Sequence, residues 1–388
     1  MKNAHIVGWG SYLPDRVLTN DGIANFVNTS HEWIYTRTGI RERRIANQQE
    51  TPAKMGFEAA AEALAVAKIS PSQVDLIVVA TSTPVHMFPS TASQIQDYLG
   101  ARRAAAFDLS AACTGFVYAL EMATNSIKVG ASENVLVIGT EVMSRVLDWQ
   151  DRATCILFGD GAGAVVVRGS SIPGGIMAST LGSDGSGGNL LSLPVNYHTN
   201  LPILHSQPSV NGHHPNAIRM NGRQVFRFAV RVIAESVQAV CRDAELDLEE
   251  VDLIIPHQAN TRIIETAAKK LKISPDKFFL NVDKAGNTSA ASIPLALCQA
   301  VGAGRLKPDD NVIFVGFGGG LTWGASLVKW DVTPPAYDTH QINWRDPRYI
   351  WARNKSRLKR LGRKVVSTIS GSPTPEARLR DAEEAKDE

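Results

Sequence analysis

Several features typical of membrane, zinc-binding or disulfide-stabilised proteins are missing from this sequence. No apolar run approaches the roughly 20 residues that a membrane-spanning helix needs, and residues 1–7 lack the apolar core of a signal peptide. The chain has four widely spaced cysteines, with no CxxC pair among Cys113, Cys155, Cys241 and Cys298. We therefore expect no metal site and no disulfide framework, and a cytoplasmic protein.

Charge and nucleotide-binding motifs are also sparse. Lys+Arg number 40 and Asp+Glu 38, so the net charge is only +2, which does not favour nucleic-acid binding. The glycine-rich segments 317–324 and 159–163 contain neither a GxGxxG before a helix nor a Walker loop, which argues against a nucleotide-binding fold. We expect Gly159–Gly163 to form a tight structural turn.

What the sequence does contain is an alternation of strand-like and helix-like segments, which indicates an α/β fold. Continuous apolar runs at 74–80 and 134–139 are typical of strands buried on both faces. Further strands are expected at 5–8, 104–109 and 159–168, helices at 53–68, 91–99, 116–129 and 225–242, and a basic, aromatic loop at 31–45.

The second half of the chain repeats the first at an offset of 177 residues. Val251-Asp252-Leu253-Ile254 matches Val74-Asp75-Leu76-Ile77, and NVIFVG at 311–316 matches NVLVIG at 134–139. The same offset takes Cys113 to Ala290, within the small-residue turn 286–292. We infer an internal duplication in which two small-residue turns meet at a pseudo-twofold centre.

Cys113 follows an apolar strand and precedes a helix, so it lies near the positive end of a helix dipole. This position favours the thiolate, the nucleophilic form of cysteine. Small neighbours (Ala111, Ala112, Gly115) would allow a substrate to approach. The alternative is a buried structural cysteine, which is common among free cysteines.

Two further polar residues occupy corresponding places in the second half. His257 follows the strand 251–255, and Asn287 lies in the small-residue turn, where open α/β sheets place their sites. Each residue alone is more often structural. Together with Cys113 they form a constellation suited to thioester chemistry, in which a thiolate carries an acyl group and two donors stabilise an oxyanion. Backbone N–H groups of the loop around Gly319 would add to that stabilisation.

Several ordered motifs make the chain resemble a 3-oxoacyl-[acyl-carrier-protein] synthase III, a condensing enzyme with the thiolase-like fold. The resemblance covers residues 3–330 and implies two pseudo-equivalent halves in a five-layered αβαβα arrangement. The motifs are EWIYTRTGIRER (32–43), FPSTASQIQ (88–96), DLSAACTGF (108–116), DRATCILFGDGAGA (151–164), SDGSGG (183–188), PHQAN (256–260), GNTSAAS (286–292) and FGGGLTWG (317–324).

The resemblance implies a reaction in two halves that initiates fatty-acid or related polyketide synthesis. Cys113 takes the acyl group of an acyl-CoA. His257 and Asn287 then assist decarboxylation of malonyl-acyl carrier protein, whose carbanion attacks the acyl group to give a 3-oxoacyl-acyl carrier protein. The backbone N–H groups of Cys113 and Gly319 would form the oxyanion hole. Acyl-CoA and malonyl-acyl carrier protein are substrates, so neither a cofactor nor a metal is implied.

The same resemblance assigns the remaining site residues. Trp33 corresponds to the residue that stacks on the CoA adenine, and Arg37 and Arg152 to those at the CoA entrance. Phe88 corresponds to an aromatic residue that caps the partner subunit's acyl pocket in a homodimer. A carrier-protein docking patch is implied at Arg262, Lys269 and Lys270. Arg223 departs from the family, where a small neutral CoA contact is usual.

A second departure is the C-terminal extension. We divide the chain into an N-terminal half (1–172), a connecting substrate-site segment (173–224), a C-terminal half (225–331) and a basic extension (332–388). Between Arg345 and Lys364 lie nine basic residues and one acidic residue. A helix is expected there, followed by disorder. It would contact an anionic membrane or an acidic protein, pack on the enzyme itself, or remain solvated.

Two other functions remain open at this stage. An acyltransferase of secondary metabolism would use the same cysteine to acylate an alcohol or amine. A noncatalytic acyl-CoA-binding protein would not need Cys113, His257 and Asn287 together. A hydroxymethylglutaryl-CoA synthase is disfavoured, because Asn287 stands where that enzyme would have an acidic residue.

Overall fold

The computed structural model describes residues 2–195 and 217–332, which form two mixed β-sheets. The first sheet consists of β1 (Asn3–Tyr12), β4 (Leu76–Ala80), β5 (Ala105–Leu109), β6 (Asn134–Val142) and β7 (Asp160–Ser170). Their order is β1-β7-β6-β4-β5. β4 runs parallel to β5 and β6, whereas β7 is antiparallel to both β6 and β1.

The second sheet has the same pattern with one strand fewer. It contains β8 (Gly175–Ser183), β11 (Leu253–Pro256), β12 (Asp310–Gly318) and β13 (Thr322–Trp330) in the order β11-β12-β13-β8. β11 is parallel to β12, and the other pairs are antiparallel. Two short antiparallel pairs join β2 (Val17–Thr19) to β3 (Glu42–Arg44) and β9 (Leu191–Ser192) to β10 (Arg219–Met220).

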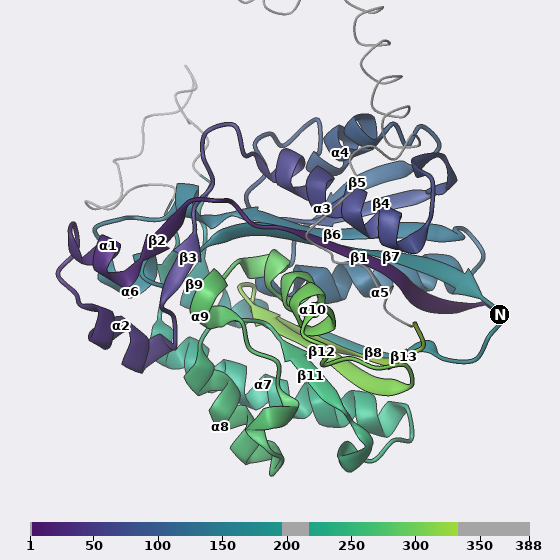
Figure 1. The fold of residues 1–388 in the computed structure, drawn as a ribbon. Helices are drawn as coiled ribbons and strands as arrows, with labels where there is room; N and C mark the ends of the chain where they lie inside the picture. The colour runs from purple at the N-terminus through teal and green to yellow at the C-terminus, as the bar shows by residue number, and fades with distance from the viewer. Residues whose placement is uncertain (1, 196–216, 333–388) are drawn as a thin grey trace, which may run out of the picture.

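Six helices complete a five-layered arrangement, αβαβα (Figure 1). α5 (Gly115–Lys128) and α10 (Ser292–Gly302) lie between the two sheets and share one apolar core with both of them. α3 (Pro52–Ala67) and α4 (Thr91–Leu99) cover the outer face of the first sheet. α7 (Gly222–Asp243) and α8 (Thr261–Leu271) cover that of the second.

Shorter elements connect these layers. The helices are α1 (Asn20–Ala24), α2 (His31–Thr38), α6 (Arg152–Cys155) and α9 (Val282–Ala285). The 3-10 turns are η1 (Pro71–Gln73), η2 (Ala112–Thr114), η3 (Met143–Val146), η4 (Gly185–Leu190), η5 (Leu248–Glu250), η6 (Pro275–Lys277) and η7 (Ser289–Ala291).

The duplication is visible in individual hydrogen bonds. The Asp75 carboxylate accepts from the Asn134 backbone N–H at 3.0 Å, and Asp252 accepts from Asn311 in the same way at 2.8 Å. The Asn134 side chain then donates to the Gln73 carbonyl, and the Asn311 side chain donates to the Glu250 carbonyl. In both cases the acceptor lies 61 residues earlier in the chain. The fold class and the two pseudo-equivalent halves predicted from the sequence are thus confirmed.

The halves differ at the edge where β5 lies. In the second half the segment at the same offset forms α9 instead of a strand. On the outer side of β11, the described residues form a parallel bridge between Ile254 and Phe278 in place of a further strand. β5 itself has its free edge outward, and Phe107 on this strand is 42% exposed.

Most predicted elements are confirmed, and two predictions are wrong. The predicted loop at 31–45 contains α2 and β3. Helix α2 forms because the Ser30 side chain caps its first turn and Gly39, at φ 76°, ends it. The predicted turn at Gly159–Gly163 is largely the start of β7. A Cβ at Gly163 would lie 2.7 Å from the Leu295 backbone nitrogen, so glycine there lets α10 pack directly on the strand.

The division into segments 1–172, 173–224 and 225–331 stays a prediction, although β8 of the middle segment pairs with β13 of the last. The predicted helix and disorder of the C-terminal extension fall on residues 333–388, outside the described residues. No helix within residues 2–195 and 217–332 is both long and apolar enough to span a membrane. The same ranges contain no cluster of His, Cys, Asp or Glu suited to a metal ion.

Candidate active site

Cys113 lies in η2, between β5 and the first turn of α5, where the sequence predicts it. Its side chain is buried, and it packs against the end of β12. A Cβ at Gly318 would lie 2.7 Å from the Cys113 backbone nitrogen, which leaves room for no other residue type. Gly318 therefore brings the glycine loop at 318–320 against the cysteine.

That the helix behind Cys113 favours its thiolate stays a prediction, and burial acts in the opposite direction. Burial raises the pKa of its thiol to about 12, and the nearby Glu141 carboxyl raises it further. A hydrogen bond with the Ser289 side chain opposes these effects. Burial of the thiol therefore opposes the thiolate, the form that the N-terminus of the following helix favours.

The predicted meeting of the two small-residue turns is confirmed. η2 packs against η7 at the centre of the molecule. Gly139 on β6 makes this possible, because a Cβ there would lie 2.2 Å from the Ala290 carbonyl oxygen. Ser289, which precedes Ala290, has a left-handed backbone with φ 49°.

His257 follows β11 and is held by both its backbone and its ring. Its backbone N–H donates to the Val315 carbonyl at 2.8 Å, and its Nδ1 lies 2.6 Å from the Ser292 hydroxyl. The ring packs edge-on against Phe317, with centroids 5.0 Å apart. Burial lowers the pKa of His257 to about 3, so the imidazole is neutral at physiological pH.

Asn287 is fixed on all sides except at its amide nitrogen. Its backbone N–H donates to the Leu157 carbonyl at 2.8 Å, and its carbonyl accepts from Gly159 at 3.0 Å. The side-chain Oδ1 accepts the Ser289 backbone N–H at 2.9 Å. This bond occupies the amide oxygen and leaves the Nδ2 end to donate to a substrate.

Short contacts therefore connect the three predicted residues. Cys113 abuts Gly318, which follows Phe317, and Phe317 packs on His257. Cys113 also interacts with Ser289, whose N–H holds Asn287. A series of neighbouring contacts thus links a thiol, a neutral imidazole and an amide, and such groups are suited to stabilising an oxyanion.

Gly319 lies beside this centre. A Cβ at Gly319 would be 3.5 Å from the Ala112 side chain and 3.1 Å from the Leu191 carbonyl. The backbone of the glycine loop thus runs next to that of η2. This is the arrangement that a shared oxyanion hole requires.

Trp33 lies between two guanidinium groups, as a nucleotide-binding surface would have it. The Arg37 guanidinium carbon is 4.3 Å from the centre of the indole ring, and that of Arg152 is 4.5 Å away. Arg152 also donates to the Asn28 carbonyl at 2.9 Å, which ties α6 to the segment before α2. These three predicted residues are brought together, and both arginines are exposed.

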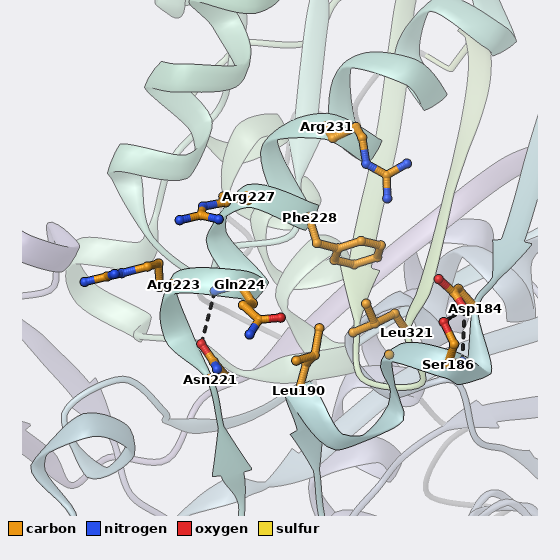
Figure 2. Close-up of a pocket in the computed structure, with 11 residues that line it drawn as sticks. Asp184, Ser186, Leu190, Asn221, Arg223, Gln224, Arg227, Phe228, Arg231 and Leu321 are labelled. Carbon is orange, nitrogen blue, oxygen red and sulfur yellow. Dashed lines mark hydrogen bonds between the residues drawn. The ribbon is translucent and has the colours of Figure 1, made fainter.

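Arg223 lines a groove of about 930 Å³ along α7 (Figure 2). Arg227 and Arg231 follow it at intervals of one helical turn and line the same groove. The floor includes Phe228 and Leu321. The sequence analysis missed Arg227 and Arg231, although their spacing of four residues is visible in the sequence.

The other predicted residues lie on the surface. Arg262, Lys269 and Lys270 are exposed on α8, whose opposite face is buried against α7. Phe88 is 88% exposed in the segment before α4, beside Met87 at 68%. A large aromatic side chain so exposed is typical of an interface.

Glu141 is a polar residue of the centre that the sequence analysis missed. It is completely buried in β6 and accepts hydrogen bonds from the Ser289 hydroxyl at 3.0 Å and from the Thr83 hydroxyl at 2.6 Å. Burial raises the pKa of its carboxyl to about 7. Its signal in the sequence was a carboxylate near the end of a largely apolar strand.

Comparison with known proteins identifies the family. The family model for the 3-oxoacyl-[acyl-carrier-protein (ACP)] synthase III C terminal matches residues 241–330, and that for 3-oxoacyl-[acyl-carrier-protein (ACP)] synthase III matches residues 107–185. The beta-ketoacyl-[acyl-carrier-protein] synthase III of Clostridium acetobutylicum is 49% identical over 330 residues, which are 85% of this chain and 99% of that protein.

Solved structures are also similar to this chain over most of its length. The crystal structure of 3-oxoacyl-[acyl-carrier-protein] synthase III from Aquifex aeolicus is similar at a TM-score of 0.77, with 48% identity, over 84% of this chain and 99% of that one. The priming beta-ketosynthase of the R1128 polyketide biosynthetic pathway is similar at a TM-score of 0.80, with 37% identity, over 86% and 98% of the two chains.

Proposed function

The chain belongs to the 3-oxoacyl-[acyl-carrier-protein] synthase III family of condensing acyltransferases, and we propose that Cys113, His257 and Asn287 carry out its reaction. The reaction is a decarboxylative Claisen condensation that joins an acyl-CoA primer to malonyl-acyl carrier protein and initiates fatty-acid synthesis. The observation that supports this assignment is the series of contacts that links a buried thiol, a neutral imidazole and a fixed amide where η2 packs against η7.

In the first half-reaction, Cys113 attacks the acyl-CoA thioester. Negative charge develops on the thioester oxygen, and the backbone N–H groups of Cys113 and Gly319 stabilise it. Collapse of the intermediate releases CoA and leaves an acyl-cysteine. The close approach of the glycine loop to η2 supports this pairing of donors.

In the second half-reaction, malonyl-acyl carrier protein loses CO₂ and its thioester oxygen gains enolate character. The neutral His257 ring and the Asn287 amide nitrogen donate to that oxygen. The assignment that suits this role has Ser292 donating to Nδ1, so that Nε2 carries the proton. A neutral imidazole suits this role, because burial at this position strongly destabilises the charged imidazolium.

CoA would reach Cys113 past Trp33, Arg37 and Arg152. The exposed guanidinium groups would bind its phosphates, and the indole would stack on the adenine. Arg223 would add a cation at the entrance, since it lies at the start of α7 and lines the groove. The acidic carrier protein would dock on Arg262, Lys269 and Lys270 of α8. No cofactor enters the proposed reaction.

A homodimer is the proposed assembly. The free edge of β5 and the exposed side chains of Phe107 and Phe88 support it, because an uncovered strand edge and apolar patch favour pairing with a second copy. The proposed role of Cys113 requires a free thiol, which suits the reducing cytoplasm.

One assay tests the function. The full chain is incubated with acyl-CoA of several lengths and malonyl-acyl carrier protein, and the products are read by mass spectrometry. We expect CO₂ release and a 3-oxoacyl-acyl carrier protein two carbons longer than the primer. A stable acyl-Cys113 with no new carbon–carbon bond would instead indicate the acyltransferase alternative.

A further inference from the structure

The hydrogen bond between His257 and Ser292 determines which ring nitrogen carries the proton. The Nδ1 atom of His257 lies 2.6 Å from the Ser292 hydroxyl, and both side chains are buried. Two arrangements fit this distance. Either the hydroxyl donates to Nδ1 and the ring proton is on Nε2, or Nδ1 donates to the hydroxyl and Nε2 has no proton. Only the first arrangement leaves Nε2 able to donate to a substrate.

A second hydrogen bond distinguishes these arrangements. The Gln258 backbone N–H donates to the same Ser292 oxygen, at 3.4 Å. If Nδ1 also donated to that oxygen, the buried hydroxyl proton of Ser292 would have no acceptor within residues 2–195 and 217–332. If the hydroxyl donates to Nδ1, all the polar atoms of this contact are paired. The contact therefore favours the tautomer with its proton on Nε2.

The Gln258 side chain holds its own backbone in place. Its amide nitrogen donates to the carbonyls of Pro256 and Phe279, at 2.8 and 3.0 Å, and its amide oxygen accepts from the Asn281 N–H at 3.0 Å. These bonds join the end of β11 to the segment before α9, and they are buried with the side chain. The N–H of Gln258 is thus kept in the direction of Ser292.

The first half of the chain has a different pair at the equivalent places. The 177-residue offset takes Ala80 to His257 and Gly115 to Ser292. Ala80 and Gly115 also meet, because a Cβ at Gly115 would lie 3.0 Å from the Ala80 Cβ. One half thus has a contact without polar side chains where the other has a buried hydrogen bond. Burial of that bond costs desolvation of both groups, so packing alone does not account for it.

We propose that Ser292 is a positioning residue that donates to Nδ1 of His257 and keeps the ring proton on Nε2, and that Gln258 orients Ser292 for this task. The proposal rests on the proposed role of His257 in condensation. Ser292 also fixes the orientation of the ring, since an imidazole turned over by 180° would place a carbon atom against the hydroxyl. Phe317 packs on the same ring and restricts its movement.

The first measurement is the ¹⁵N spectrum of the full chain, labelled in histidine, at neutral pH. The chain has nine histidines, and the resonances of His257 are those that His257→Gln lacks. In the wild type we expect a directly bonded proton on Nε2 and none on Nδ1. A proton on Nδ1 would overturn the proposal. No substrate is present, so this result is independent of whether the condensation occurs.

The second measurement compares Ser292→Ala with the control Ser236→Ala. Ser236 lies on α7, and its hydroxyl is also buried but has no hydrogen-bond partner in the part of the chain that the structure describes. We expect Ser292→Ala to shift the Nδ1 resonance of His257 and to populate the other tautomer, because the donor to Nδ1 is gone. Ser236→Ala should leave both ring resonances unchanged. Unchanged resonances in Ser292→Ala would refute the role of Ser292.

Kinetics separate positioning from packing. Enzyme acylated with acetyl-CoA is mixed with malonyl-acyl carrier protein in a single turnover. We expect Ser292→Ala to condense about tenfold more slowly, the effect of losing one hydrogen bond, but to be acylated at the wild-type rate. Ser292→Thr keeps a hydroxyl and should restore condensation.

Two kinetic outcomes would contradict the proposal. Equal slowing of both half-reactions in Ser292→Ala would indicate a packing role, and slow condensation in Ser236→Ala would show that the loss of any buried hydroxyl has this effect. If Ser292→Thr does not fold, the wild-type spectrum and Ser292→Ala decide. A wild-type enzyme that does not condense would refute the proposed function, whereas the ¹⁵N spectrum would still test the tautomer.

Discussion

Ala112 and Ser289 occupy equivalent positions in the two halves, and both have a left-handed backbone, with φ of 45° and 49°. Each precedes the residue at the centre of its turn, Cys113 or Ala290. The duplication thus supplied two identical strained turns. One now precedes the proposed nucleophile, whereas the other carries a hydroxyl that donates to Glu141.

The contact between these turns should be sensitive to the size of residue 139. In Gly139→Ala the new methyl group would meet the Ala290 carbonyl at 2.2 Å, and backbone must shift. We expect a loss of about 3 kcal/mol in unfolding free energy, measured by urea denaturation. Gly302→Ala is the control: it meets no atom within 4 Å and should change stability by less than about 1 kcal/mol.

The two half-reactions should separate by mutation. His257→Ala removes a donor to the enolate but leaves Cys113 in place, so we expect normal acylation and condensation slowed by about 100-fold or more. Intact-protein mass spectrometry follows the first step and product analysis the second. Cys113→Ala should instead abolish acylation. Loss of both steps in His257→Ala would contradict this division of roles.

His257 should also make the protein sensitive to acid. Its pKa is lowered from 6.5 to about 3, so the unfolded chain binds a proton that the folded chain does not as pH falls below 6.5. Folding stability is therefore lost over that window. We therefore compare the unfolding free energy of His257→Gln with that of the wild type at two pH values. Between pH 7.5 and pH 5 the difference should shift by about 2 kcal/mol in favour of the variant. An unchanged difference between the two pH values would show that His257 is protonated in the fold.

The cluster around Trp33 should act on the nucleotide part of the substrate. Arg152→Ala removes one guanidinium from the indole and from the proposed phosphate site. We expect KM for acyl-CoA to rise about tenfold, with little change for an acyl-pantetheine that lacks the nucleotide. Steady-state kinetics with both thioesters provide the measurement. An equal effect on the two would place Arg152 elsewhere in the reaction.

Assembly should depend on the exposed face of β5. Phe107→Lys puts a charge on this strand, and we expect the proposed dimer to dissociate in sedimentation velocity experiments. Val129→Lys is the control, since Val129 is a similarly exposed apolar residue, at 78%, at the end of α5. A wild-type protein that sediments as a monomer would refute the homodimer itself.

The sequence predicts this fold well where local signals are strong. The helix expected at 91–99 coincides with α4, which has Ser90 and Gly100 as caps. The continuous apolar strands and the 177-residue offset could also be recognised directly in the sequence. Helix α2 was missed because its aromatic and basic residues form no clear apolar stripe, although the capping residues Ser30 and Gly39 were present.

For the site, the sequence predicted only the residues that lie in recognisable motifs. Cys113, His257 and Asn287 could be named from sequence, but the burial that raises the pKa of the Cys113 thiol could not. Nor could the place of Glu141, which hydrogen-bonds to a residue 148 positions away. Such contacts arise from packing between the halves, and no local pattern encodes them.

The loss of the strand equivalent to β5 limits how the protein can associate. In the described part of the chain, the edges formed by β1 and β8 lie against one another, and the segment around Phe278 and Phe279 covers β11. β5 is left as the open edge. In the proposed homodimer, two copies that pair through this edge leave no second one exposed, so the assembly would close on itself. Had both halves kept that strand, each copy could have joined two others, and the same contact would have grown into a filament.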